Sequence, residues 1–512
     1  MRALWPKRGE ALPAVASAVL FGIAFPPFPL VIPVFLCLVP VAVAIARRAD
    51  AAESWRAAAR IGFWFGLVGY GINLYWIALA LLIYTKLAIL GYIGALLVLA
   101  PVVTLTAVAL FLARRATRLP LAIVLPVVWV ASEVALNHLS DLAFPWLPLG
   151  LAMAHHPTLA QAADMSGVRG LSFWIAAING LLADAWLLRA RARAVAARLA
   201  GIAALVAGVA LYGTWRMAST TLRPVAPVGI VQPNVPQEEK WQAENQGRIV
   251  GMLASGSREV LAQRRARLLL WPEAALPGFL VEHPEWRMIV GRLASEYDTP
   301  ILFGVLDVTF FGPNEYEYYN AAMLADSTGR IGAQPPYHKS YLVPVVERVP
   351  FVNPRWFGKL KYFGAYGRGG HPEPFTLPFG KVGVLICYES IFPERSRTYR
   401  REGASLLVNI TNDAWFGRSL APYQHEAHLV FRAIENRVGI VRAANTGISG
   451  YVDPLGRIHG ATGLFVPAAR IYDAQTTDVR TLYVRWGDWI GLLSLVGTAA
   501  ALALAVRQRR AP

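Results

Sequence analysis

Cys387 lies in GVLICYES, residues 383–390, at the end of an apolar run that predicts a buried β-strand. The next residues, IFPERSRTYRR, predict a helix, so the cysteine falls on a turn between a strand and a helix. Such a turn projects a side chain from the carboxyl end of a sheet, and N–H groups near the helix start can bind an oxyanion. The thiol is either an inert core residue or a nucleophile. It becomes a nucleophile only where a base or a positive charge favours the thiolate.

Two ionisable residues at the ends of other apolar runs are candidate partners. Glu273 follows an apolar strand in LLLWPEAALP, and a carboxylate at the mouth of an apolar sheet is expected to have a raised pKa, which suits a general base. Lys339, in PPYHKSYLVP, would stabilise a tetrahedral oxyanion and help to hold the thiolate. Each residue alone is more typical of the solvated rim of a sheet than of a catalytic site.

These residues belong to a segment, 219–485, in which short aliphatic runs alternate with helical stretches. The pattern predicts a layered α/β domain with buried sheets. Strands are predicted at 228–233, 268–273, 300–308, 320–327, 382–389, 405–413 and 439–447, and helices at 242–265, 284–297, 392–402 and 419–437.

The rest of the chain consists of apolar runs long enough to cross a bilayer, which takes about 20 residues. The sequence FPPFPLVIP, with a tight re-entry at Pro26–Pro29, separates the first two, which are short. Eight spans are predicted, at 11–27, 29–46, 60–83, 88–113, 119–137, 171–189, 199–217 and 487–506. The chain therefore divides into a membrane domain of seven spans at 1–218, the α/β domain at 219–485, and a last span with a short tail at 486–512.

The distribution of arginines predicts the orientation in the membrane. Arginines cluster in the short connections 47–60, 114–118 and 189–198, and short cytoplasmic loops are enriched in Lys and Arg. With the N-terminus in the cytoplasm, eight spans place each of these loops and the C-terminus inside. The same count places residues 219–485 outside the cytoplasm.

Composition excludes several other classes of protein. Of 512 residues, 55% are hydrophobic and 16% are charged, which does not fit an ordinary soluble protein. The net charge of +17 lies largely in membrane-flanking loops, so nucleic acid is not an expected partner. Cys37 and Cys387, the two cysteines of the chain, form no disulfide framework, and no cofactor or metal site is predicted because His155–His156 is expected to be a polar loop.

Taken together, the three motifs resemble the Glu–Lys–Cys triad of the nitrilase (carbon–nitrogen hydrolase) superfamily. With its eight-span frame, the chain is similar to the apolipoprotein N-acyltransferase family of bacterial inner-membrane enzymes. Further matches are VQPNVPQEEKW (231–241), FPWLPLG (144–150), QAADMSGVRGLSFW (161–174), NITNDAWFG (409–417) and RAIENRVGIVRAANTGISG (432–450).

The resemblance implies a fold and roles for individual residues. The catalytic domain would be an α-β-β-α sandwich in the periplasm, attached to a multi-pass frame in the inner membrane. Cys387 would be the nucleophile that carries an acyl thioester, Glu273 the general base and Lys339 the oxyanion stabiliser. The supporting residues would be Glu347, beside the lysine, with Tyr388 and Glu389 after the cysteine, the Tyr388 backbone N–H joining the oxyanion hole, and Trp241 and Trp415 at the substrate rim.

The lysine motif departs from the family pattern. The family has Tyr-Asp-Lys-Arg-His-Leu-Val-Pro-Phe-Gly-Glu, whereas this chain has YHKSYLVPVVE, with His338, Ser340, Tyr341 and Val345–Val346 at the changed positions. The spacing from lysine to glutamate is kept, so the departures concern the residues around the triad. Downstream, residues 349–370 combine aromatic rings, basic residues and glycines, which predicts a lipid-facing lid.

The implied reaction is a two-step acyl transfer without a cofactor. A membrane phospholipid would acylate the cysteine, and the α-amino group of a lipoprotein's diacylglyceryl-cysteine would then take the acyl chain, as the last step of lipoprotein maturation. Two alternatives stay open at this point. A membrane-tethered amidohydrolase would use the same triad with water as acceptor. A transporter would need ionisable residues inside the spans, where Glu133 and Asp184 are the main ones.

Overall fold

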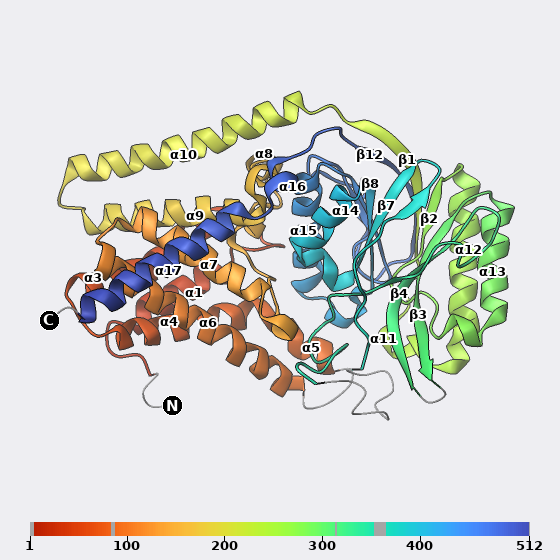
Figure 1. Ribbon diagram of the computed structural model, residues 1–512, viewed down its shortest axis with the longest axis horizontal. Helices are drawn as coiled ribbons and strands as arrows, with labels where there is room; N and C mark the ends of the chain where they lie inside the picture. Colours follow the sequence, from red (N-terminus) through yellow and green to blue (C-terminus); the bar gives the residue numbers. More distant parts are fainter. Residues whose placement is uncertain (1–4, 83–87, 313–314, 353–364, 511–512) are drawn as a thin grey trace.

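The protein has a helical bundle at one end and an α/β domain at the other (Figure 1). The computed structural model describes residues 5–82, 88–312, 315–352 and 365–510. Helix α10 (Ala192–Ser219) runs along the outside of the bundle and delivers the chain to the α/β domain, and α17 (Trp489–Arg510) returns it to the bundle. The other helices of the bundle are α1 (Ala11–Gly22), α2 (Ile32–Leu36), α3 (Val39–Asp50), α4 (Trp55–Leu74), α5 (Trp76–Leu82), α6 (Ala88–Thr117), α7 (Leu121–Asn137), α8 (Pro157–Ala160) and α9 (Ala163–Leu187).

The bundle has the character of a membrane domain. Among the described residues, five helical segments are long and apolar enough to cross a bilayer, at 32–50, 88–117, 163–187, 192–219 and 489–508. Helices α1 and α7 are equally apolar but have 12 and 17 residues. Helical structure occurs in all the predicted spans, so the membrane character is confirmed, while the count of eight stays a prediction.

Two six-stranded sheets form the centre of the α/β domain in the described part of the chain. The first has the order β12-β1-β2-β3-β4-β5 and the second β11-β10-β9-β8-β7-β6. The strands are β1 (Arg223–Gln232), β2 (Leu268–Leu270), β3 (Ile301–Gly312), β4 (Glu315–Ala325), β5 (Tyr337–His338), β6 (Phe375–Leu377), β7 (Gly380–Ile386), β8 (Ala404–Thr411), β9 (Ile440–Ala444), β10 (Gly450–Val452), β11 (Ile458–His459) and β12 (Ala468–Thr476).

The two sheets lie between two layers of helices, in the α-β-β-α order that the resemblance implies (Figure 1). Parallel strands β1-β2-β3 in one sheet and β7-β8-β9 in the other form the buried centres, and antiparallel strands extend each sheet to its edges. Helices α12 (Gln246–Gln263) and α13 (Pro284–Glu296) cover the outer sheet, and α14 (Pro393–Arg401) and α15 (Ala421–Asn436) cover the sheet nearer the bundle.

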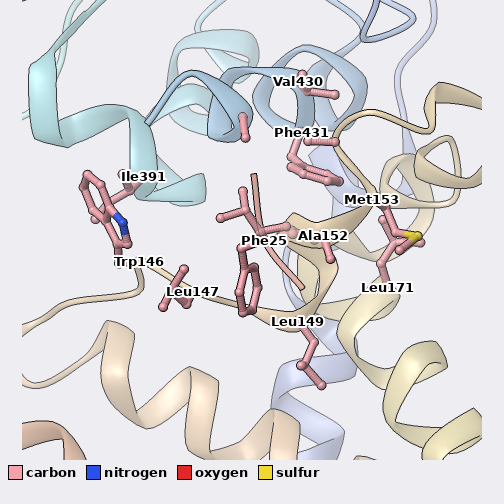
Figure 2. Packing of buried hydrophobic residues seen from close by; sticks show 14 of the residues in the cluster. Phe25, Trp146, Leu147, Leu149, Ala152, Met153, Leu171, Ile391, Val430 and Phe431 are labelled. Carbon is pink, nitrogen blue, oxygen red and sulfur yellow. The ribbon is translucent and has the colours of Figure 1, made fainter. Parts of the chain in front are cut away.

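Helix α15 is buried from both sides. Every residue of α15 except Tyr423 is buried, because one face packs on the domain and the other meets α9 of the bundle. Figure 2 shows this junction, where Val430 and Phe431 of α15 lie on the side of Ala152 and Met153, and all four belong to one continuous apolar cluster that also includes Trp146 and Leu149. The bundle and the domain therefore share a core.

A glycine allows a close approach between the two parts. Gly167 kinks α9 with a φ of +73°, a conformation that strains residues with a Cβ. A Cβ at this position would lie 2.8 Å from the ring of Tyr483. Directly after the kink, the backbone N–H of Val168 donates to Oε1 of Glu435 at 2.8 Å.

Candidate active site

Cys387 lies on a sharp turn directly after β7. Its φ is +50°, in the left-handed region that residues other than glycine seldom adopt. The 3-10 turn Cys387–Ile391 follows, and α14 begins two residues later. The predicted arrangement of strand, turn and helix around Cys387 is therefore confirmed, with only 8% of the residue exposed.

Glu273 and Lys339 meet in the buried space between the two sheets. The Lys339 ammonium donates to Oε1 of Glu273 at 3.2 Å and to Oε1 of Glu347 at 2.8 Å. The second carboxylate oxygen of Glu273 accepts the backbone N–H of Asn412, which follows β8 in the opposite sheet, at 2.9 Å. Glu273 thus connects the two sheets at their carboxyl ends.

The electrostatics of Glu273 differ from the prediction. Burial by itself would raise the pKa of Glu273, as expected for a carboxylate in an apolar sheet. The charge of Lys339, the amide of Asn320 and the charge of Lys240 outweigh burial and hold this pKa below its usual value. The prediction of a raised pKa was wrong because it ignored these partners, and Glu273 is an ionised carboxylate in the free site.

The Cys387 thiol has the opposite tendency. Burial raises its pKa, and the negative charges of Glu273 and Asp413 add to this effect. The charge of Lys339 and a hydrogen bond with Thr411 oppose it. A thiol in these surroundings is protonated at rest, so thiolate has to form as its proton moves to a base.

Asn320, on β4, joins the two carboxylates around the lysine. Its Nδ2 donates to Oε1 of Glu273 at 2.7 Å and to Oε1 of Glu347 at 3.0 Å. The other oxygen of Glu347 accepts the backbone N–H of Val343 at 2.8 Å. Glu347 therefore lies beside Lys339, as the resemblance implies, whereas sequence analysis missed Asn320 because a single asparagine in a strand carries no pattern.

Glu389 is a fully buried link between the cysteine turn and the lysine segment. Its Oε1 accepts the hydroxyl of Tyr337 at 2.7 Å and both the N–H and hydroxyl of Ser340 at 2.8 Å. Its Oε2 accepts the N–H of Ile386 at 2.9 Å. These hydrogen bonds fix β7 and its turn relative to the residues on either side of Lys339.

The residues that depart from the family's lysine motif contact neighbouring side chains. Ser340 is bound to Glu389, and the ring of Tyr341 stacks on Phe392 with centroids 3.9 Å apart. His338 is hydrogen-bonded through Nε2 to Asp307 at 2.7 Å and stacks on Tyr319 at 4.0 Å. The changed residues thus support the same lysine segment.

Tyr388 connects the site to the helical bundle. Its hydroxyl donates to the backbone carbonyl of Ala143, in the connection after α7, at 2.7 Å. Its ring is also near Phe144, with centroids 6.2 Å apart. The hydroxyl is therefore bound to the bundle while it still feels the charges of Lys339 and Glu347, and the backbone N–H of Tyr388 stays the candidate for the oxyanion hole.

A second polar group, absent from the sequence prediction, lies behind Cys387. His425, on α15, is 3.0 Å from the Cys387 carbonyl through Nε2 and 3.0 Å from Asp413 through Nδ1. Arg442, on β9, binds the other oxygen of Asp413 at 2.5 Å. Burial acts to raise the pKa of Asp413, but the charges of Arg442 and His425 lower it, so the group holds the strained turn with an ionised carboxylate.

The two predicted rim tryptophans lie on different elements. Trp241 directly follows α11 (Gln237–Lys240) and is 40% exposed, and Trp415 lies half-buried in the turn Asp413–Phe416 after β8. In the same turn, the ring of Phe416 meets Trp76 of α5 at 4.9 Å. Most of the predicted lid at 349–370 lies outside the described residues, although Phe351, at its start, is 67% exposed.

Two protein families match different parts of the chain. Residues 227–481 match the carbon–nitrogen hydrolases, and residues 17–181 match the apolipoprotein N-acyltransferase N-terminal domain. The first match covers the two sheets and their helices, and the second covers most of the bundle.

Several relatives match nearly the whole chain. An apolipoprotein N-acyltransferase of Geobacter metallireducens is 35% identical over 98% of this chain and 96% of its own length. Enzymes of the same name from Chlorobaculum tepidum and Methylococcus capsulatus are 30% and 31% identical over 96% and 97% of this chain. Among solved structures, an amidase of the nitrilase superfamily from Nesterenkonia sp. AN1 aligns with 53% of this chain and 95% of its own, at 18% identity and a TM-score of 0.38.

Proposed function

The chain belongs to the apolipoprotein N-acyltransferase family, and from this premise we propose that it moves an acyl chain from a membrane phospholipid through Cys387 to lipoproteins. It is an acyltransferase, and N-acylation of lipoproteins is its function. Beyond this activity, we propose which residues carry out the steps, which two substrates react, and how the protein is oriented in the membrane.

In the first half-reaction, the sulfur of Cys387 attacks the ester carbonyl of the phospholipid while its proton moves to the Glu273 carboxylate. The ammonium of Lys339 and the backbone N–H of Tyr388 stabilise the resulting oxyanion. The carbonyl then re-forms, the ester C–O bond breaks, and Glu273 returns the proton to the departing lysophospholipid alcohol. The products are a lysophospholipid and a thioester on Cys387.

In the second half-reaction, the neutral α-amine of the diacylglyceryl-cysteine attacks the thioester. A new C–N bond forms, the C–S bond breaks, and one N–H proton passes through Glu273 to the sulfur. Two steps through one covalent intermediate give ping-pong kinetics. The product is an amide on the lipoprotein, and Cys387 is a free thiol again.

The main observation behind this proposal is the hydrogen-bonded group of Glu273, Lys339 and Glu347 beside the sharp turn that holds Cys387. Because the pKa of the thiol is raised and the pKa of Glu273 is lowered, the free site holds a protonated thiol and an ionised carboxylate. That charge state is the one that the first half-reaction needs.

The proposed orientation follows the arginine distribution and the helices of the bundle. Eight spans would divide the chain at about 218 and 486, with both termini in the cytoplasm and the catalytic domain in the periplasm of a bacterial inner membrane. The exposed ring of Trp241, the tryptophan Trp415 and the segment 349–370 would then meet lipid headgroups at the rim of the site. A cysteine introduced at the exposed position 457 tests this orientation: in intact cells, an impermeant thiol reagent should label it, and protection from the reagent would contradict the proposal.

The catalytic proposal is tested by mass spectrometry of the purified protein mixed with phospholipid. We expect an acyl adduct on Cys387 that persists in water and disappears when a diacylglyceryl lipopeptide with a free α-amine is added. Cys387→Ala should insert into the membrane normally and form no adduct, and acyl transfer by that variant would refute the assignment. Rapid release of free fatty acid in the absence of lipopeptide would instead support the amidohydrolase alternative, which family membership disfavours.

A further inference from the structure

A second lysine lies buried in the site with no assigned part in the reaction. Lys240 ends α11 and is 2% exposed. Its Nζ donates to the backbone carbonyl of Glu273 at 3.1 Å. Within the described ranges, no carboxylate lies at ion-pair distance from it. A buried lysine without a paired carboxylate is costly to keep charged.

The two lysines of the site differ in how readily they lose a proton. Lys339 lies between two carboxylates, so its pKa is raised well above the usual value despite burial, and it is a permanent cation. Burial lowers the pKa of Lys240 to about 8, against the opposing charges of Glu273 and Cys387. In the described part of the chain, Glu273, which follows β2, and Cys387, which follows β7, are the titratable groups whose charges act on Lys240, and the Glu273 carboxylate is itself bound to Lys339.

The second half-reaction poses a proton problem that the triad does not solve. An α-amino group has an ordinary pKa of about 8, so most acceptor molecules arrive at neutral pH as ammonium ions, which cannot attack a carbonyl. Glu273 already receives the second proton of the same nitrogen when the amine attacks, and one carboxylate cannot hold both protons at once. A base works best when its pKa is close to the operating pH.

We propose that Lys240, in its neutral form, takes the first proton from the incoming α-ammonium, so that a free amine reaches the thioester on Cys387. The N–H bond of the substrate ammonium breaks and a new one forms on Nζ, which leaves a neutral substrate amine and a charged Lys240. The amine then attacks, and its second proton follows the route through Glu273. Lys240 returns its proton to solvent before the next acceptor binds, beside the exposed ring of Trp241.

This role belongs to the second half-reaction alone, and it rests on the proposed function. The first half-reaction begins from a thiol and an ester and brings no ammonium into the site. Lys240 should therefore affect the discharge of the thioester far more than its formation. A lysine that only holds the Glu273 turn in place would affect both half-reactions alike.

Two substitutions of Lys240 distinguish a lysine that only holds the Glu273 turn in place from one that accepts a proton. Lys240→Gln keeps an N–H donor for the Glu273 carbonyl but cannot accept a proton. Lys240→Arg keeps the positive charge but does not lose its proton, because an arginine in a protein stays charged. With each variant acylated in advance, the rate of thioester discharge is measured at pH 7 with two acceptors, a diacylglyceryl lipopeptide and hydroxylamine, an amine that is already neutral at this pH.

We expect both variants to form the thioester within about threefold of the wild-type rate and to discharge it to the lipopeptide at least about tenfold more slowly. Discharge to hydroxylamine should be nearly unchanged, and raising the pH to 9 should restore much of the lipopeptide rate in Lys240→Gln. Equal losses with both acceptors, or full lipopeptide activity in Lys240→Arg, would overturn the proposal. Failure of the wild-type protein to form any thioester would instead overturn the proposed function.

Discussion

At the scale of single residues, the site holds carboxylates and a lysine in direct hydrogen-bonding contact. Glu273 and Glu347 share one lysine and one asparagine amide in a buried space. Each of these hydrogen bonds favours the charged form of its acceptor. Asn320 is the neutral member of the group, which makes its contribution measurable without removing a charge.

Asn320→Leu should move the acid limb of thioester formation to higher pH. Asn320 lowers the pKa of Glu273, so its loss raises that pKa, and the base becomes protonated sooner as the pH falls. Because the folded-state pKa lies below the unfolded value, the stability that the ionised carboxylate contributes is present above the unfolded pKa and is lost as the pH falls through the folded one. We expect little rate loss at pH 7, where Glu273 stays ionised, and a loss that grows to about tenfold on the acid limb if the pKa rises by about one unit, measured by mass spectrometry of the thioester across pH. An unshifted acid limb would show that Asn320 does not tune this base.

Sequence analysis found the residues that end long apolar runs and missed the polar residues between them. Cys387, Glu273 and Lys339 stand out because a reactive group at a strand end interrupts a pattern. Asn320 and Lys240 do not, since a polar residue in a short helix or on a strand is common and only its neighbours in space give it a role. The same limit explains the error in the pKa of Glu273, whose burial was visible in the sequence and whose partners were not.

At the scale of secondary-structure elements, two buried polar groups hold the cysteine turn from opposite sides. Glu389 binds the turn to the lysine segment, and His425 with Asp413 and Arg442 binds it to α15 and β9. A left-handed residue at the end of a strand needs such support, because its conformation costs about 1–2 kcal/mol. The turn is therefore positioned by residues from several elements.

Glu389→Gln should destabilise the domain and slow the formation of the thioester. The neutral amide cannot accept four hydrogen bonds as the carboxylate does, so at least one buried donor loses its partner, at a cost of about 1–3 kcal/mol. Thermal unfolding in detergent and the acylation rate at a temperature well below unfolding provide the two readouts. Glu373→Gln, at an exposed position, is the control and should change neither. If the two variants unfolded at the same temperature and were acylated at the same rate, Glu389 would not be needed to hold the turn.

Arg442→Met should be more severe, because it leaves the buried carboxylate of Asp413 without its guanidinium. Breaking a buried ion pair from one side typically costs about 3–5 kcal/mol. The pKa of Asp413 then rises toward that of a buried acid, so the variant should lose further stability as the pH is raised and the carboxylate is forced to ionise. Unfolding measured from pH 5 to pH 8 tests this trend, with Arg457→Met at an exposed position as control. A pH-independent loss would contradict the electrostatic explanation.

The elements themselves were predictable to different degrees. Helices α12 to α15 and the central strands were found because their apolar periodicity is long and regular. The short strands β5, β6, β10 and β11, at or next to the sheet edges, have two or three residues each and carry too little pattern. The pairing of β12 with β1 joins segments more than 200 residues apart, and no local signal could indicate it.

At the scale of the whole molecule, the bundle and the domain are joined by buried polar contacts as well as apolar packing. Arg437, fully buried in the domain, binds Asp164 of α9 at 2.7 Å and Gln161 at 2.6 Å. Arg216 of α10 binds the same aspartate at 2.6 Å. The active site also depends on this junction, since the hydroxyl of Tyr388 reaches the connection after α7. We therefore regard the two parts as one folding and catalytic unit.

Asp164→Leu should destabilise the junction by about 3–5 kcal/mol, because a buried guanidinium loses its carboxylate. Combining it with Arg437→Met removes both charges, so the double variant should recover part of that loss, and the difference gives the coupling between the two residues. Thermal unfolding of the full chain in detergent provides the measurement. Losses that simply add would show that the ion pair does not join the two parts.

Helix α10 differs from the rest of the bundle, because Gly213 is its only buried residue. Its 28 residues extend for about 42 Å, whereas the hydrocarbon core of a bilayer is about 30 Å thick. With so little protein packed around it, α10 is expected to meet this hydrophobic mismatch by tilting, while the better-packed α9 beside it keeps its angle. Since β1 follows α10 within a few residues, the thickness of the host membrane acts on the first strand of the catalytic domain. A cell that remodels its lipid tails would thereby change the mechanical load on this acyltransferase.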